Sequence, residues 1–186
     1  AHVCLLDALG IDRAAVLGAS AGAPSVLQTA LRHPQRVSAL VLAVPIVHHP
    51  DAAKPLDVAD DALLMRLLGS DFLFWAGLQV ARDAVFRHVL ATPPELLHAA
   101  STTERARADA MADGILPVSL RVAGLRDDTG LGRRLGPAPL ESIRVPTLVI
   151  SARDDGFGTY AGAQYTAARI PGARFLGFER GGHLWL

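Results

Sequence analysis

Residues 14–22 read AAVLGASAG, a short apolar run followed by the pattern Gly-x-Ser-x-Gly. The apolar run predicts a strand, and the residues from the turn to about His33 are typical of a helix. In a strand–turn–helix of this kind, the serine sits on a sharp turn that lifts its hydroxyl above the sheet. We expect Gly18 and Gly22 to be required, because a side chain at either position would collide where strand and helix pass closely. The stretch therefore predicts Ser20 as a nucleophile.

The segments on either side of this turn alternate between strand and helix. Residues 37–44 are almost continuously apolar, as in a parallel strand that is covered on both faces. Residues 147–151 and 174–178 form similar runs and are separated by a helical segment at about 161–170. Strands that alternate with helices predict an α/β domain with a parallel sheet.

A helical insertion is expected to interrupt this alternation at residues 46–140, so that residues 1–45 and 141–186 form the core. Within it, Thr92 and Ser101 each begin a capping-box pattern, with a glutamate three residues later. The apolar residues of the insertion indicate either helices packed on one another or a lid over an apolar substrate pocket. These residues are Leu63, Leu64, Leu67, Leu68, Phe72, Leu73, Phe74, Trp75 and Leu78.

Two glycine-containing segments are expected to end helices in this insertion. Gly114 is a candidate C-terminal stop. Residues 130–139 are rich in glycine and proline and are expected to form a loop that leads back to the core.

Composition narrows the class of partner. The 186 residues contain 18 basic and 18 acidic side chains, so there is no net field to attract nucleic acid or an anionic membrane. A small-molecule substrate is the expected partner, and the sequence leaves the oligomeric state open.

Cys4 is the only cysteine, which excludes an internal disulfide and a cysteine-based zinc cluster. No apolar stretch reaches the roughly 20 residues that a membrane span needs. We expect a cytoplasmic protein, and the abundance of Ala, Arg, Leu and Gly suggests a GC-rich bacterial gene.

Ser20 needs a histidine as base and a carboxylate that orients this histidine, because a serine hydroxyl is otherwise a poor nucleophile. Of the seven histidines, only His183 lies beyond the last predicted strand, in a flexible Gly-Gly-His stretch. Asp154 and Asp155 follow the strand at 147–151. Catalytic groups gather at that end of parallel strands.

From Asp7 to His183 the chain resembles the α/β-hydrolase superfamily, whose members carry a serine, an acid and a histidine in this order. In that family the acid stands in a stretch similar to Gly-x-x-Asp-Pro. Residues 152–156, ARDDG, are similar to it with both end residues substituted. This alignment implies Asp155 as the acid, with Asp154 as the alternative.

The resemblance also implies a mechanism. Ser20 attacks a carbonyl carbon, His183 transfers the proton, Asp155 fixes the imidazole, and water hydrolyses the acyl-serine. The backbone N–H of Ala21 is the expected first donor of the oxyanion hole. Members of the family take the second donor from a loop after an earlier strand, so we expect this chain to be N-terminally truncated, with the strand at 14–17 as an open edge. No cofactor and no metal are expected.

The main expectation is a serine esterase or lactonase for a small, fairly apolar substrate. A hydrolase of carbon–carbon bonds that uses the same triad is the alternative, and a catalytically silent fragment or a small-molecule binding relative is a third. Dehalogenases and epoxide hydrolases are unlike this chain, because they need an aspartate where Ser20 stands. Arg121, Arg126 and Arg153 are candidates for binding a substrate carboxylate, but structural or solvated arginines are commoner, so none is assigned.

Overall fold

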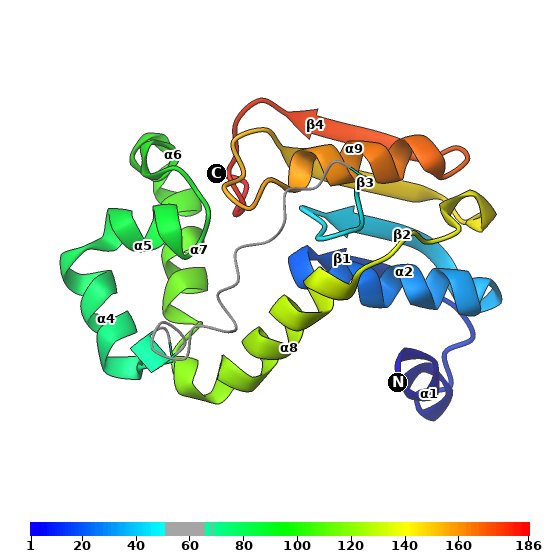
Figure 1. The fold of residues 1–186 in the computed structure, drawn as a ribbon, viewed down its shortest axis with the longest axis horizontal. Helices are drawn as coiled ribbons and strands as arrows, with labels where there is room; N and C mark the ends of the chain where they lie inside the picture. Colours follow the sequence, from blue (N-terminus) through cyan, green and yellow to red (C-terminus); the bar gives the residue numbers. More distant parts are fainter. Residues whose placement is uncertain (51–65, 68) are drawn as a thin grey trace. The chain divides into compact units, whose positions relative to one another are not determined.

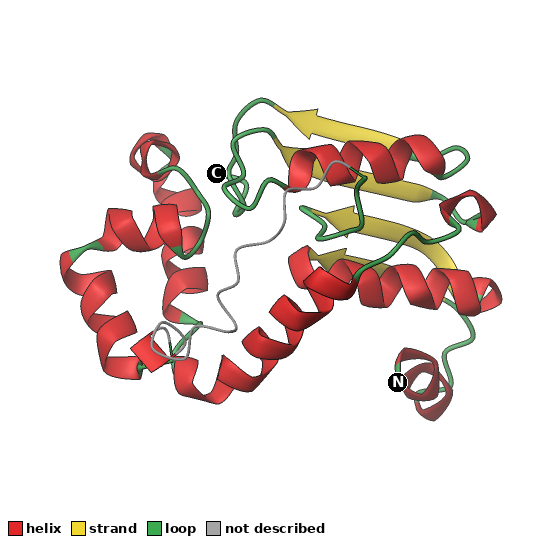
Figure 2. Cartoon of the chain, viewed as in Figure 1, coloured by secondary structure: helices red, strands yellow, loops and turns green. Residues whose placement is uncertain are grey.

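The computed structural model describes residues 1–50, 66–67 and 69–186, apart from the side chains of residue 129 and residues 131–133. In this part of the chain, four parallel strands form one sheet in the order β1-β2-β3-β4 (Figure 1). The strands are β1 (Ala14–Ala19), β2 (Val37–Ala43), β3 (Thr147–Ala152) and β4 (Arg174–Phe178). Helices separate them along the chain (Figure 2), so the predicted α/β fold with a parallel sheet is confirmed.

By its internal contacts the chain divides into two compact units. The sheet unit comprises Ala1–Ala52, Leu135–Arg153 and Gly158–Phe178. The helical unit comprises Ala53–Arg134, Asp154–Phe157 and Glu179–Leu186. The short segments that follow β3 and β4 therefore belong to the helical unit.

In the sheet unit, helices pack on the strands through regularly spaced apolar residues. Helix α2 (Ala23–Arg32) contacts β1 and β2, and helix α9 (Thr159–Arg169) contacts β3 and β4. Ala23, Val26, Leu27 and Ala30 of α2 are buried at a spacing of three and four residues, which places them on one helix face. The unit also contains α1 (His2–Ala8), η1 (Ser20–Gly22), η2 (Pro34–Arg36) and η4 (Leu140–Ser142).

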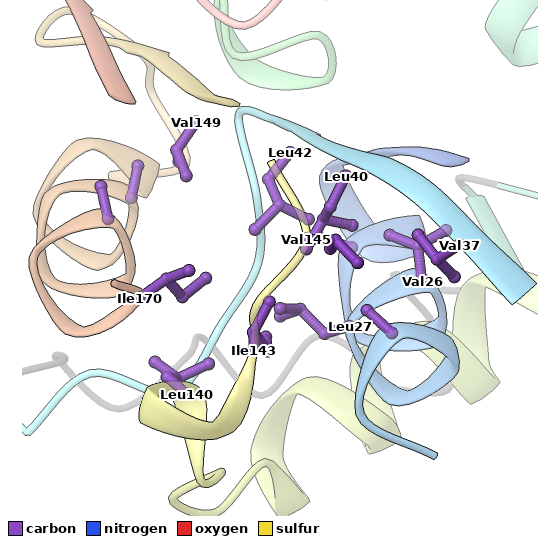
Figure 3. Packing of buried hydrophobic residues seen from close by; sticks show 14 residues of the cluster. Val26, Leu27, Val37, Leu40, Leu42, Leu140, Ile143, Val145, Val149 and Ile170 are labelled. Carbon is purple, nitrogen blue, oxygen red and sulfur yellow. The ribbon is translucent and has the colours of Figure 1, made fainter. Parts of the chain in front are cut away.

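The core of the sheet unit combines strand, helix and loop residues (Figure 3). It includes Val26, Leu27, Val37, Leu40, Leu42, Leu140, Ile143, Val145, Val149 and Ile170. Each buried leucine or isoleucine of this kind stabilises a fold by about 1.5–3 kcal/mol. β1 lies at an edge of the described sheet, and Leu17 on this strand is 62% exposed.

The helical unit has a core of its own. Its helices are α4 (Asp71–Val80), α5 (Arg82–His88), α6 (Pro94–Ala99), α7 (Thr102–Asp113), η3 (Val118–Arg121) and α8 (Val122–Arg134). The core consists of Phe74, Leu78, Val85, Phe86, Leu90, Leu97, Ala108, Ala112, Val118 and Leu184. Of the apolar residues singled out on α4, Phe74 and Leu78 are buried, whereas Phe72, Leu73 and Trp75 are exposed. Leu67 is also exposed, and Leu63, Leu64 and Leu68 lie outside the described residues.

Of the two predicted capping boxes, the one at Ser101 forms the hydrogen bond to the N-cap side chain, and the one at Thr92 is wrong. Ser101 is the N-cap of α7, and its hydroxyl accepts a hydrogen bond from the N–H of Glu104. Thr92 does not cap α6, whose N-cap is Pro93. Its hydroxyl instead hydrogen-bonds to residues that are distant in the sequence.

The two glycine-based predictions of helix ends also have different outcomes. Gly114 is the C-cap of α7, as predicted. The predicted loop at residues 130–139 is wrong in its first half, because α8 continues to Arg134. A glycine weakens a helix by only about 1 kcal/mol, whereas a proline interrupts it, and the first proline after α8 is Pro137.

Candidate active site

Ser20 stands on a strained turn between β1 and α2. It is the first residue after β1 and begins the short helix η1, which leads directly into α2. Its φ angle is 49°, a left-handed conformation that side-chain-bearing residues rarely adopt. Strain of this kind costs about 1–3 kcal/mol and is concentrated at functional sites. The turn therefore has the backbone geometry that the Gly-x-Ser-x-Gly motif predicts.

The two glycines of the motif differ in their surroundings. A Cβ atom at Gly18 would lie 2.4 Å from Val26 Cγ2 and 2.8 Å from Ala23 Cα, so only glycine allows α2 to pass so close to β1. A Cβ atom at Gly22 would meet no atom within 4 Å. The expectation that both glycines are required is correct for Gly18 and wrong for Gly22, because the chain is close to the helix only before the turn.

Ala21, the expected oxyanion donor, is the second residue of η1 and is half-buried. The first N–H groups of a helix have no partner within the helix, and they carry its partial positive charge. A backbone N–H at this position suits the binding of a developing negative charge.

Asp155 and His183 form a hydrogen-bonded pair in the helical unit. Asp155 is the third residue after β3, and His183 is the fifth residue after β4. Asp155 Oδ2 lies 2.9 Å from His183 Nδ1. The side chain of Asp155 is fully buried and that of His183 is 12% exposed. A buried carboxylate in contact with one ring nitrogen fixes both the orientation and the tautomer of an imidazole.

The loop that follows Asp155 holds both members of the pair. The N–H of Phe157 donates to Asp155 Oδ1 over 2.9 Å. The Phe157 ring stands perpendicular to the His183 ring, with 4.7 Å between the ring centroids. This edge-to-face arrangement is the one that aromatic rings prefer, so the loop supports the carboxylate and the imidazole together.

Asp154 has a different partner. Its Oδ1 accepts a hydrogen bond from the N–H of Gly182 over 2.8 Å. The geometry therefore favours Asp155 over Asp154 as the acid that orients His183. Asp154 instead holds the backbone next to the histidine.

The structure brings together the predicted acid and base in one unit, and Ser20 and Ala21 belong to the other unit. The structure also contains a second histidine–carboxylate pair, in which His98 Nε2 lies 3.0 Å from Asp83 Oδ1. Both side chains of this pair are exposed. Exposure leaves such a pair open to water, so it lacks the fixed orientation of the buried pair.

Two of the three arginines considered as carboxylate ligands make contacts within their own unit. Arg121 donates to the backbone carbonyls of Gly114 and Ile115. The guanidinium of Arg153 lies over the Tyr160 ring, 4.5 Å from its centroid. Both side chains therefore have partners within their own unit.

Phe157 and Thr92 contact the Asp155–His183 pair or its loops but were not predicted from the sequence. No local pattern marks Phe157, because its role depends on the loop after β4. Thr92 does begin a recognisable pattern, but that pattern indicated a helix cap.

Two further features are absent from the described residues. No three His, Cys, Asp or Glu side chains among them are arranged to bind a metal ion. The same part of the chain contains no helix with the length and apolar character of a membrane span.

Comparisons with known proteins agree with this architecture. The family model for the alpha/beta hydrolase fold matches residues 1–186. The chain therefore belongs to the α/β-hydrolase fold family.

A curated relative is the 2-hydroxy-6-oxononadienedioate/2-hydroxy-6-oxononatrienedioate hydrolase of Cupriavidus pinatubonensis, which is 30% identical over 179 residues. The match covers 96% of this chain and 58% of the relative, so the chain spans a little over half the length of that enzyme.

Solved structures give the same result. An alpha/beta hydrolase fold protein from Nakamurella multipartita matches with 27% identity and a TM-score of 0.63, over 98% of this chain and 66% of that one. A hydrolase from Pseudomonas aeruginosa PA01 matches with 28% identity and a TM-score of 0.64, over 98% of this chain and 62% of that one.

Proposed function

We propose that the protein is a serine hydrolase in which Ser20 is the nucleophile, His183 the general base and Asp155 the orienting acid. The observation that carries this proposal is the hydrogen bond between the buried Asp155 carboxylate and His183 Nδ1. The strained turn at Ser20 supports it from the other unit. The order of these residues along the chain is also that of the family.

In this mechanism His183 Nδ1 is occupied by Asp155, so Nε2 takes the proton from the Ser20 hydroxyl. The serine oxygen forms a bond to the carbonyl carbon of the substrate, and the carbonyl oxygen becomes an oxyanion that accepts a hydrogen bond from the N–H of Ala21. The carboxylate of Asp155 stabilises the imidazolium. His183 then gives its proton to the leaving group, which departs and leaves an acyl-serine. Water, deprotonated by His183, hydrolyses this intermediate and restores the serine.

Two classes of substrate fit this mechanism equally well. The first is a carboxylic ester or lactone of a small, fairly apolar molecule, for which the leaving group is an alcohol or an enol. In this proposal residues 46–140 act as a lid that selects the substrate. The exposed apolar side chains of Phe72, Leu73 and Trp75 on α4 support such a role.

The second class is a ketone that is cleaved at a carbon–carbon bond, and the curated relative favours it. The name of that relative's substrate describes a nine-carbon dicarboxylate with a hydroxyl and a keto group and without an ester. Hydrolysis of such a compound has to break a carbon–carbon bond next to the keto group. The leaving group is then a carbanion, which must receive the proton at carbon.

Labelling with a fluorophosphonate tests the proposed nucleophile in the full-length protein. We expect one adduct, mapped by mass spectrometry to Ser20 and absent in Ser20→Ala. Ser25→Ala is a matched control, because Ser25 Oγ also lies within hydrogen-bond distance of a histidine, 2.6 Å from His2 Nε2, but on an exposed helix surface. An adduct on Ser25, or none on a folded protein, would contradict the proposal.

A comparison of two substrates separates the two reactions. We expect an esterase or lactonase to release p-nitrophenol from p-nitrophenyl butyrate with a much higher kcat/KM than it cleaves a 2-hydroxy-6-oxo dienoate. For a carbon–carbon hydrolase the order is reversed. Loss of both activities in Ser20→Ala is required in either case.

A further inference from the structure

Thr92 is a buried threonine whose hydroxyl uses its full hydrogen-bonding capacity. It lies in the connection between α5 and α6 and is 0% exposed. Its Oγ1 accepts hydrogen bonds from the N–H groups of His183 and Leu184, each over 3.1 Å, and donates to the carbonyl of Leu90 over 3.0 Å. A hydroxyl has one donor and two acceptor sites. All three are engaged, and the two acceptor sites hold His183 and its neighbour.

The residue before Thr92 contacts the acid loop as well. The carbonyl of Ala91 accepts from the N–H of Gly156 over 2.9 Å and from the N–H of His183 over 3.3 Å. Gly156 follows Asp155 directly. Residues 91–92 therefore hydrogen-bond to the loop that carries the acid and to the loop that carries the base.

The loops that carry the acid and the base also pack closely against residues 91–92. A Cβ atom at Gly182, where φ is +59°, would lie 2.7 Å from Thr92 Cγ2 and 2.9 Å from Thr92 Cα. A Cβ atom at Gly156 would lie 3.1 Å from Ala91 Cα. Both loops thus reach the 91–92 backbone at a distance that only glycine permits without adjustment of a neighbour.

Ala91 itself is strained, with a φ angle of 48°. A side-chain-bearing residue keeps this conformation only where surrounding contacts determine it. The left-handed backbone at Ala91 accompanies the orientation of the Ala91 carbonyl and the Thr92 hydroxyl toward the two loops.

We infer that Thr92 is a positioning residue, which holds the His183 backbone so that the imidazole meets the Asp155 carboxylate in the productive orientation. This inference rests on the proposed function, in which His183 and Asp155 are base and acid. Arg107 supports the same loop from α7, because its Nη2 donates to the carbonyls of Leu184 and Trp185, each over 3.0 Å. Thr92 binds the N–H groups of this loop and Arg107 binds its carbonyls.

The test compares Thr92→Val with Thr92→Ser. Valine keeps the size of threonine but leaves the N–H groups of His183 and Leu184 without this acceptor, whereas serine keeps the hydroxyl. Misplacement of a catalytic group by about 1 Å costs about 100-fold in rate. We expect Thr92→Val to lower kcat for p-nitrophenyl butyrate and the rate of fluorophosphonate labelling by about 10- to 100-fold, with KM changed less than about threefold. Thr92→Ser is expected to stay within about threefold of the wild type.

Thr166→Val is the matched control. Thr166 is also 0% exposed, but its hydroxyl has no hydrogen-bond partner among the described residues. The same loss of a buried hydroxyl in α9 is expected to leave both rates unchanged. A folded Thr92→Val protein with wild-type rates would overturn the inference.

Two measurements do not depend on hydrolase activity. The first is the downfield proton signal of the His183–Asp155 hydrogen bond in a nuclear magnetic resonance spectrum, which Thr92→Val is expected to broaden and Thr92→Ser to retain. If the wild type does not react with the fluorophosphonate, the proposed function fails, while this signal still reports whether Thr92 holds the pair.

The second is hydrogen exchange of the wild-type protein, which needs no variant to fold. The N–H groups of His183 and Leu184 are expected to exchange at least about 100-fold more slowly than in an unstructured chain. Exchange of both groups at the unstructured rate would overturn the inference.

Discussion

The turn at Ser20 and the pair formed by Asp155 and His183 are built in opposite ways. The turn depends on neighbours in the sequence, because the contacts that require glycine at position 18 are made by Ala23 and Val26. The pair joins residues 28 positions apart, and its support from Thr92 spans 91 positions. The first kind of site is encoded in a short motif, whereas the second exists only when distant segments have folded together.

Substitution of each aspartate by asparagine is the test of this comparison with the largest expected effect. Asp155→Asn removes the charge that stabilises the imidazolium and favours the wrong tautomer, so kcat for p-nitrophenyl butyrate is expected to fall by about 10⁴-fold. Asp154→Asn keeps an oxygen that accepts from the N–H of Gly182 and is expected to lower kcat by less than about tenfold. A larger loss in Asp154→Asn than in Asp155→Asn would identify Asp154 as the acid and contradict the assignment.

The motif itself offers the next test, because its two glycines have different surroundings. Gly18→Ala forces a Cβ atom against Val26 and Ala23, so we expect a loss of about 2–3 kcal/mol in the free energy of unfolding. Gly22→Ala points into open space and is expected to change this free energy by less than about 0.5 kcal/mol. Urea denaturation of both variants measures the difference. Equal losses would show that the turn is not held by the contact at Gly18.

The sequence was sufficient for the parts of the molecule that local patterns determine. The four strands, the helix after Ser20 and the cap at Ser101 were predicted from apolar runs and capping residues, and all are present. The acid was predicted to be Asp155, with Asp154 as the alternative, because both follow the strand at 147–151 and the family resemblance implies the second of them. The hydrogen bond between Asp155 and His183 favours Asp155 over Asp154.

The predictions that failed did so for different physical reasons. Thr92 and Glu95 match a capping box, but the Thr92 hydroxyl binds the loop after β4 instead. Residues 130–134 are helical despite their glycines, because local propensity is a weak constraint once a helix is under way. Gly22 fits the motif, but a Cβ atom there would meet no atom within 4 Å. Each of these patterns is present in the sequence. Whether the predicted feature forms depends on contacts that only the folded structure shows.

The smallest expected effect tests whether long-range polar contacts also stabilise the rest of the helical unit. Asp71 begins α4 and accepts hydrogen bonds from the N–H and the hydroxyl of Ser119, 48 positions away. These bonds hold the pKa of Asp71 below its ordinary value of 3.8. A lowered pKa in the folded state means that the ionised carboxylate stabilises the fold above pH 3.8, and that this contribution is lost as the pH falls through the folded-state pKa.

Asp71→Asn is therefore expected to lower the midpoint of thermal unfolding slightly at neutral pH, and the difference from the wild type is expected to shrink as the pH falls below 3.8. Asp113→Asn, which changes an exposed carboxylate at the end of α7, is the control and is expected to show no such pH-dependent difference. A constant difference between Asp71→Asn and the wild type across this pH range would mean that the charge of Asp71 does not contribute. The hydrogen bonds between Asp71 and Ser119 would then contribute to stability independently of the ionisation of the carboxylate.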